Sequence, residues 1–330
     1  MEGLKREPEQ ATLASLLAHF GLESPVNLVW SHATNSHALL KESLEGGKVH
    51  MIEADILMGR HETDGGEGGA EIPIMAHPPA TSSDLSFAEF ARSVREQHAN
   101  GGRRIGVKLD FKDPKAVVPV LQNLTSEGVG ENSPVWVNAD IWQGPGGAVP
   151  KFNAMEFLAA CRKYCPYASL SVGWTTGPGG LHGIPGALIG TAGYRPKHID
   201  VALRDLRAAG ILPHEGNSSA IEGLDGRNET TLITFPVSVI YTRISAKRTD
   251  TFDRLLSASE GCTLTLWGED TVSGSRYVES GAMSKYKGKI FVDTKPPKFA
   301  GVLFEHQTTL SVVLFTAVLA IPVLVFILQM

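Results

Sequence analysis

Eight β-strand patterns alternate with helical patterns along most of the 330-residue chain. Each strand pattern is a short run rich in apolar and β-branched residues, and capping residues such as Ser86 and Asp113 open the helical patterns between them. The predicted strands lie within residues 27–31, 49–55, 104–110, 135–140, 168–174, 231–241, 262–267 and 289–293. Such alternation is typical of a parallel sheet, and eight repeats favour an α/β fold of the (β/α)8 TIM-type barrel class. A doubly wound open sheet is the alternative, although no GxGxxG or phosphate loop follows the first strand.

The second predicted strand ends in two carboxylates, Glu53 and Asp55. Side chains two residues apart leave a strand on the same face, so both carboxylates point the same way. A glycine-rich loop follows, and a short apolar run at residues 72–75 then leads to His77. Two oxygen ligands with a returning histidine predict a Mg²⁺ site that carries an acid/base group.

Polar side chains also follow the other predicted strands. Parallel barrels place their chemistry at the carboxyl ends of the strands, so these residues are expected to share one rim. The candidates are His32, Asn35, Lys108, Asp110, Lys112, Asn138, Asp140, Trp174, Tyr241, Arg243 and Trp267. By contrast, we expect four other histidines at the surface, namely His61, His98, His182 and His198.

Three of the rim carboxylates come from two adjacent strands and suit an octahedral metal: Glu53, Asp55 and Asp110. We expect Mg²⁺ there, with Ca²⁺ or Mn²⁺ as alternatives, to polarise a phosphoryl oxygen. His32 and His77 would divide the roles of base or nucleophile and acid. Of the remaining candidates, Lys108 or Lys112 would neutralise phosphate charge, and Trp267 would line the site or stack on a substrate. The other rim residues are predicted substrate contacts.

Composition and the chain ends restrict the class of partner. A net charge of -5 argues against electrostatic binding of nucleic acid over a broad surface, and three cysteines do not make a disulfide framework. The uncharged run 310–328 predicts a single membrane-spanning helix after a barrel domain at 1–300 and a juxtamembrane linker at 301–309. The side of the membrane stays open: no secretory signal precedes the barrel, whereas three glycosylation sequons weakly favour the secretory side.

The segments around these residues resemble a known superfamily. His32-Ala-Thr-Asn35, the IEADI motif around Glu53, Ala76-His77 and the LDFK motif ending at Lys112 resemble the ordered pattern of glycerophosphodiester phosphodiesterases and sphingomyelinases D. That resemblance implies a (β/α)8 barrel with one Mg²⁺ on the three carboxylates, a catalytic histidine pair, substrate contacts at Asn35 and Lys112, and an aromatic wall at Trp267.

Over about residues 14–300 the chain resembles the menorin domain family more closely, through WSHATNS, IEADI, AHPP, VKLDFK, VNADIWQGP and SVGWTT. It departs from the phosphodiesterase pattern at Pro78, where Asp or Gly is usual, and around Ser31-His32-Ala33, where His-Arg-Gly is usual. These departures leave the substrate in doubt more than the metal.

Three functions therefore remain open. The first is a membrane-anchored, metal-dependent phosphodiesterase that acts on a glycerophosphodiester or a lysophospholipid headgroup. The second, which the menorin resemblance implies, is a non-catalytic module that binds a protein partner in neuronal or sensory-tissue development and maintenance. The third, a lyase or aldolase, needs a Schiff-base lysine; Lys108 is available, but the adjacent carboxylates favour a metal.

Overall fold

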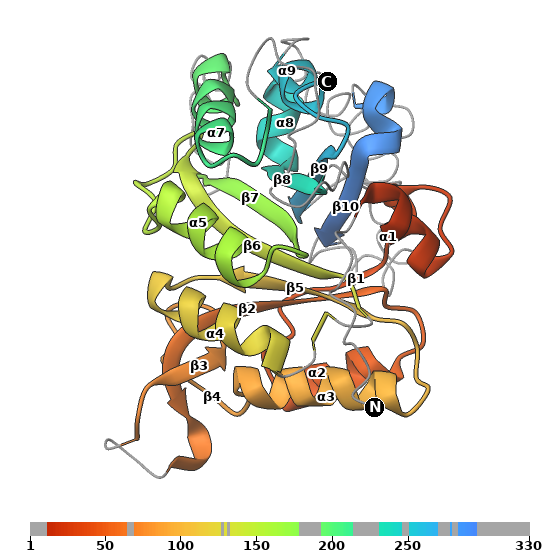
Figure 1. Cartoon of the computed structure of the whole chain (residues 1–330), viewed down its shortest axis with the longest axis vertical. Helices are drawn as coiled ribbons and strands as arrows, with labels where there is room; N and C mark the ends of the chain where they lie inside the picture. Colours follow the sequence, from red (N-terminus) through yellow and green to blue (C-terminus); the bar gives the residue numbers. More distant parts are fainter. Residues whose placement is uncertain are drawn as a thin grey trace, which may run out of the picture.

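A parallel sheet that curls into a nearly closed ring forms the centre of the molecule (Figure 1). The computed structural model describes residues 12–64, 69–126, 129–130, 133–177, 193–213, 231–245, 251–269, 278 and 283–295. Within these residues eight parallel strands follow the order β1-β2-β5-β6-β7-β8-β9-β10. The strands are β1 (Trp30–Ser31), β2 (Met51–His61), β5 (Gly106–Phe111), β6 (Val135–Gln143), β7 (Ser169–Thr175), β8 (Ile233–Ser238), β9 (Cys262–Glu269) and β10 (Ile290–Lys295). All eight predicted strands are confirmed, and the arrangement fits a TIM-type barrel.

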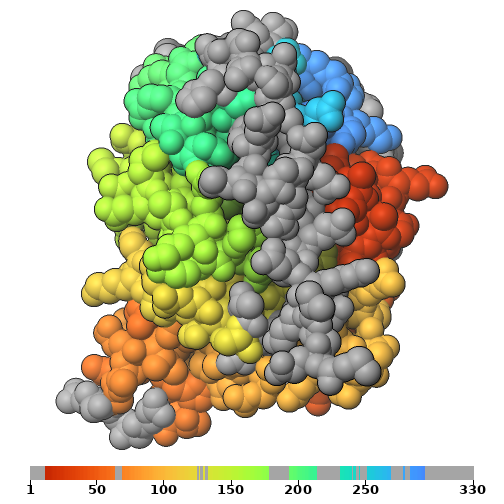
Figure 2. All heavy atoms as spheres, in the orientation of Figure 1, coloured from red at the N-terminus to blue at the C-terminus, as the bar shows by residue number. Residues whose placement is uncertain are grey.

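Helices cover the outside of the ring and separate consecutive strands. They are α1 (Leu13–Phe20), α2 (His37–Glu45), α3 (Phe87–Ala99), α4 (Pro114–Ser126), α5 (Ala154–Tyr164), α7 (Pro196–Ala208), α8 (Val239–Ser245) and α9 (Thr251–Leu256), with short 3-10 turns η1 (Pro25–Asn27), η2 (Glu62–Asp64) and η3 (Ser284–Lys289). Side-chain caps fix several helix starts: Ser86 accepts from the Glu89 amide at α3, and Asn153 accepts from two amides of α5. In Figure 2 the coloured segments follow one another over the surface in chain order, and the red N-terminal segment lies beside the blue C-terminal one.

An excursion from β2 is the main departure from the predicted pattern. This strand extends to His61, beyond its predicted end at residue 55. It pairs with antiparallel β3 (Ile72–Met75) and with the short strand β4 (Ser82–Ser83). The excursion therefore brings the chain back alongside β2 just before His77.

A compact apolar cluster fills the amino-terminal end of the ring, opposite the predicted site. Helix α1 contributes Leu16 to this cluster, which also holds Leu28, Met51, Trp136, Leu232 and Phe291. The Trp136 ring lies 4.9 Å from the Phe291 ring, between strands far apart in the sequence. A larger cluster packs the outer faces of the strands against the helices. The two packed regions leave the carboxyl ends of the strands as the place for polar groups.

The described residues contain no helix long and apolar enough to cross a bilayer. The predicted membrane helix at 310–328 and the linker at 301–309 lie outside the described residues.

Candidate metal and acid–base site

Buried polar side chains occupy the middle of the ring. The register pairs Glu53 with Lys108 and Asp55 with Asp110 across β2 and β5, and Asp110 with Asn138 across β5 and β6. The Lys108 ammonium lies 3.6 Å from the carboxylate of Asp293 on β10, which is not a neighbour of β5. This contact must cross the interior, so the alternate residues of these strands face one another inside the ring.

Three carboxylates meet at one end of the ring, where β5 ends and where the pairing of β2 with β5 stops at Ile56. One oxygen from each of Glu53, Asp55 and Asp110 can be chosen so that all three lie within 4.8 Å of one another. The Lys112 ammonium lies 3.1 Å from Asp55 and 2.7 Å from Asp110. Burial alone would raise the pKa of Asp110, but Lys112 and Lys108 outweigh burial and hold that pKa below its ordinary value.

Amide side chains orient the same carboxylates. Asn35 donates from Nδ2 to Asp55 at 2.8 Å and accepts from the Asp55 amide at 2.9 Å. Asn138 donates to Asp110 at 2.7 Å and accepts from Ser171 at 2.6 Å. The predicted polar contacts at Asn35 and Asn138 are therefore brought to the carboxylates, where they fix the orientation of the carboxyl groups.

Glu53 carries a proton at neutral pH more readily than an ordinary glutamate. It is almost fully buried and accepts from the Ala33 amide at 2.6 Å. Burial raises its pKa to about 7, in spite of the nearby positive charges of His32 and Lys108. The Ala33 backbone has a φ of 53°, a left-handed conformation that non-glycine residues rarely adopt. The hydrogen bond to Glu53 helps hold this turn, which carries His32 into the site.

His32 is one-third exposed, and two carboxylates orient its ring. Its Nδ1 lies 3.3 Å from Glu53 and 3.3 Å from Asp293. Carboxylate oxygens accept hydrogen bonds, so Nδ1 carries a hydrogen, and in the neutral form of the ring Nε2 is the unprotonated nitrogen. Asp293 is a site residue that sequence reasoning missed, although it is the last residue of the predicted eighth strand. Burial would raise the pKa of Asp293, but its hydrogen bond to His32 and the charge of Lys108 lower it.

Asp140 lies two residues after Asn138 on β6, beside Gly173 of β7. A Cβ built on Gly173 would lie only 2.9 Å from the Asp140 carboxylate, so this glycine leaves room for the acid. Burial, reinforced by the charge of Asp110, raises the pKa of Asp140 to about 7. The mouth of the ring thus holds a second acid that is partly protonated at neutral pH.

His77 is close to the site through its backbone only. The preceding residue, Ala76, donates its amide to the Asp55 carbonyl at 2.9 Å. The His77 side chain is exposed, and its Nδ1 donates to the Pro78 carbonyl at 2.6 Å. The described contacts therefore do not join it to the carboxylates, and the predicted pairing with His32 stays a prediction.

Two of the predicted substrate contacts are buried side chains. Trp174 is buried against α7 and donates from Nε1 to the His198 carbonyl at 3.2 Å. Since Ser171 faces inward, Trp174 has the opposite parity on β7 and faces the helices. Tyr241 is buried in α8 because β8 ends at Ser238 and the chain then becomes helical.

The last two predicted contacts are Trp267, which stays near the rim, and Arg243, whose side chain is not described. Trp267 is partly exposed and is in register with Asp293, so its position suits a wall of the site. Arg243 belongs to helix α8, and its side chain lies outside the described residues. His198, expected at the surface, is buried instead.

Comparisons with known proteins agree with the sequence motifs. The chain shares 38% identity with human protein FAM151B over 155 residues, which are 47% of this chain and 52% of that protein. It therefore spans about half the length of this curated relative. Two solved structures are weakly similar: 2,3-dimethylmalate lyase (11% identity, TM-score 0.39, 92% of this chain and 87% of that one) and L-ribulose 3-epimerase (10% identity, TM-score 0.40, 82% and 81%). The model of the menorin N-terminal domain matches residues 25–295, and the chain therefore belongs to the menorin family.

Proposed function

We propose that this barrel is a metal-dependent phosphodiesterase, related to the glycerophosphodiesterase and sphingomyelinase D-like enzymes, that acts on a glycerophosphodiester or lysophospholipid-type substrate. One observation carries the proposal: three carboxylates converge within 4.8 Å beside a histidine whose Nδ1 contacts one of them, Glu53, and also Asp293. That arrangement supplies an oxygen-rich cation site and an oriented base at one end of a barrel.

The donor set fits Mg²⁺, with Ca²⁺ or Mn²⁺ as alternatives. Glu53, Asp55 and Asp110 would each supply one oxygen, and waters and a substrate oxygen would complete the shell. The buried centre holds an excess of acidic over basic side chains, since five carboxyl groups face two ammonium groups and one imidazole. These groups are Glu53, Asp55, Asp110, Asp140, Asp293, Lys108, Lys112 and His32. A divalent cation would balance this charge, and when bound it would polarise a phosphoryl oxygen.

His32 is best placed to act as the base or nucleophile. Its Nε2 accepts the proton of the attacking hydroxyl or water, and the carboxylates of Glu53 and Asp293 stabilise the imidazolium that forms. Such assistance is worth roughly 10²–10⁴ in rate. His77 would deliver a proton to the leaving oxygen after its side chain turns from the Pro78 carbonyl.

The two lysines differ in what they can contact. Lys108 is buried and pairs with Asp293, so it serves the interior charge balance. Lys112 keeps part of its side chain exposed at the mouth and is the better contact for substrate phosphate.

Turnover by the full chain, in detergent, tests the proposal against a panel of glycerophosphodiesters and lysophospholipids with Mg²⁺ or chelator. We expect Mg²⁺-dependent release that His32→Ala abolishes and that Glu96→Gln, on the exposed side of α3, leaves intact. His77→Ala tests the second histidine separately. If the folded, metal-bound protein turned over no substrate of the panel, the proposed phosphodiesterase activity would be refuted.

A binding role without catalysis is the second candidate. Two observations favour it: Lys112 already neutralises Asp55 and Asp110, and His77 hydrogen-bonds to its own loop. In that case His32→Ala would leave capture of a protein partner unchanged, and no substrate in the panel would be hydrolysed.

We also propose that residues 310–328 anchor the barrel to a membrane as a single C-terminal span. Resistance to alkaline extraction by the full chain, and its loss on deletion of this run, would test the anchor.

A further inference from the structure

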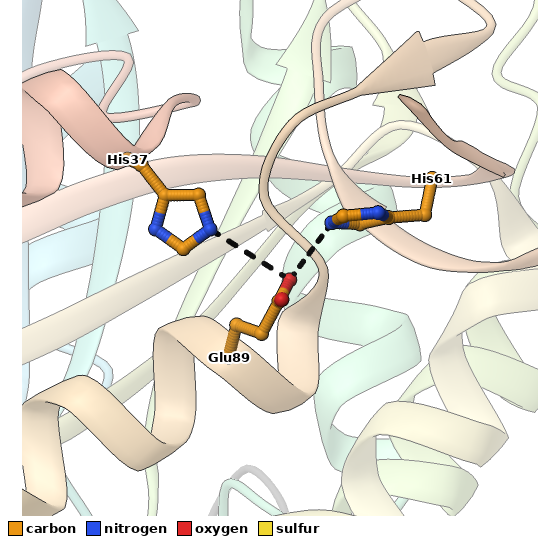
Figure 3. A group of neighbouring side chains, drawn as sticks. All are labelled: His37, His61 and Glu89. Atoms are coloured by element: carbon orange, nitrogen blue, oxygen red, sulfur yellow. Dashed lines mark ion pairs between the residues drawn. The ribbon is translucent and has the colours of Figure 1, made fainter. Parts of the chain in front are cut away.

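A second group of metal-type ligands lies outside the barrel interior, at the base of the β2 excursion. His37 is the first residue of α2, His61 is the last residue of β2, and Glu89 lies in the first turn of α3. Figure 3 shows both imidazole rings directed at the Glu89 carboxylate. His61 Nε2 lies 3.0 Å from Glu89 Oε2, and His37 Nε2 lies 3.9 Å from the same oxygen. His61 was expected at the surface, but its side chain is only 11% exposed.

The spacing of these donor atoms matches a tetrahedral ion. Zinc bonds to imidazole nitrogen or carboxylate oxygen are about 2.0–2.1 Å long, so neighbouring ligands in a tetrahedral site stand about 3.3 Å apart. One donor atom from each residue can be chosen so that all three lie within 4.8 Å of one another. The observed separations of 3.0 Å and 3.9 Å bracket the tetrahedral value. A small adjustment of the exposed His37 ring would bring all three to bonding distance.

The surroundings already hold two of the ligands in place. Ser86 donates to Glu89 Oε2 from both its amide and its hydroxyl, at 2.9 and 2.7 Å. His61 Nδ1 lies 2.7 Å from Thr63 Oγ1, which can accept a hydrogen from that nitrogen. Without a metal, Nε2 contacts two acceptors, the Asp84 carbonyl and Glu89, and Nδ1 accepts from the Thr63 amide at 3.3 Å, so Nε2 carries the hydrogen. Metal binding at Nε2 would move the hydrogen to Nδ1, which would then donate to Thr63 Oγ1 in place of its contact with the Thr63 amide. An oriented second nitrogen is the usual support of a metal-ligating histidine.

We propose that His37, His61 and Glu89 form a binding site for a transition-metal dication of the Zn²⁺ type, separate from the oxygen-rich centre of the barrel. Two imidazoles and one carboxylate are a typical zinc ligand set, with the fourth position open to water. The barrel carboxylates, by contrast, favour Mg²⁺. The two sites therefore differ in the metal they select, and this inference does not depend on the phosphodiesterase.

The test uses the full chain in non-ionic detergent, with excess Mg²⁺ present to occupy the oxygen-rich centre. Zn²⁺ is titrated calorimetrically, and Co²⁺ is then titrated while its absorption spectrum reports the coordination geometry. We expect one Zn²⁺ per chain, and a tetrahedral Co²⁺ spectrum with bound nitrogen. His37→Ala and Glu89→Gln should each weaken Zn²⁺ binding at least ~10-fold, because each removes a ligand.

Two features keep the test interpretable. The His37 side chain is about half exposed, and glutamine at position 89 can still complete the capping box of α3, so neither variant should unfold the protein. Circular dichroism checks this directly, and Glu96→Gln on the same helix is the matched control. Binding that survives both ligand variants, binding lost in Asp110→Asn instead, or no binding at all would overturn the proposal.

Discussion

The metal-free protein should lose stability as pH rises through neutrality, and Glu53 should account for much of that loss. The pKa of this buried acid rises from an ordinary value of 4.5 to about 7 on folding. The folded state therefore binds the proton more tightly than the unfolded state does. Its contribution is fully present below about pH 4.5 and is lost as pH rises through about 7. At ~1.4 kcal/mol per tenfold change in proton affinity, the loss is roughly 3 kcal/mol in the free energy of unfolding.

Urea unfolding in chelator, followed by tryptophan fluorescence from about pH 5 to about pH 8, measures this loss. Glu53→Gln cannot titrate, so its unfolding free energy should fall less steeply with pH than that of the wild type. Asp140 adds to the loss, because burial also raises its pKa to about 7. Burial lowers the pKa of His19, His50, His98 and His198, so these four oppose the loss as pH rises from about 5. Glu96→Gln, at an exposed position, should keep the full slope. Mg²⁺ should stabilise the wild type more at high pH, since it competes with the proton for Glu53.

Two results would refute this reasoning. A chelated wild type that gains stability relative to Glu53→Gln from about pH 5 to about pH 8 would show that Glu53 ionises more readily in the folded state than in the unfolded chain. A Glu53→Gln protein with the same slope as the wild type would place the titrating group elsewhere.

Three further outcomes are expected. Under the proposed function, Asp293→Asn should lower phosphodiesterase turnover by ~10² or more while Mg²⁺ affinity stays the same, because Asp293 orients His32 and is not one of the three proposed metal ligands; equal turnover would contradict that role. Trp174→Ala should cost about 3–5 kcal/mol of stability by urea unfolding, since the ring is fully buried, whereas Met155→Ala at an exposed position should change it little. Asn153→Ala should cost about 1 kcal/mol of stability in a melting curve, because the α5 cap is lost. Lys151→Ala, two residues earlier, is the control and should leave the melting curve unchanged.

The order of the strands was predictable because each one is a short apolar run between capping or glycine signals. The convergence of Glu53, Asp55 and Asp110 followed from the same pattern, since parallel strands bring such residues to one end of the barrel. Trp174 was expected to face the interior, but it faces the helices. Its position at a strand end does not say which face of the strand it is on, and only every second residue faces the interior. Tyr241 belongs to helix α8 and not to the predicted sixth strand, because the β-prone run from Val239 continues past the end of β8 as a helix.

Contacts between distant segments were harder to foresee. Asp293 is the final residue of a strand that was predicted, so the rule for strand ends would have found it. The cluster of His37, His61 and Glu89 depends on how far the β2 excursion folds back, and no local pattern encodes that distance.

The contact between His32 and Asp293 joins residues 261 positions apart, one just after the first strand of the ring and the other on the last. A ribosome delivers the carboxylates of β2 and β5 well before it delivers Asp293. A nascent or prematurely ended chain would therefore hold the acidic cluster without its complete histidine support. Under the proposed function, hydrolytic competence would arrive only with the last strand, so synthesis itself would keep an unfinished chain from attacking phosphodiesters.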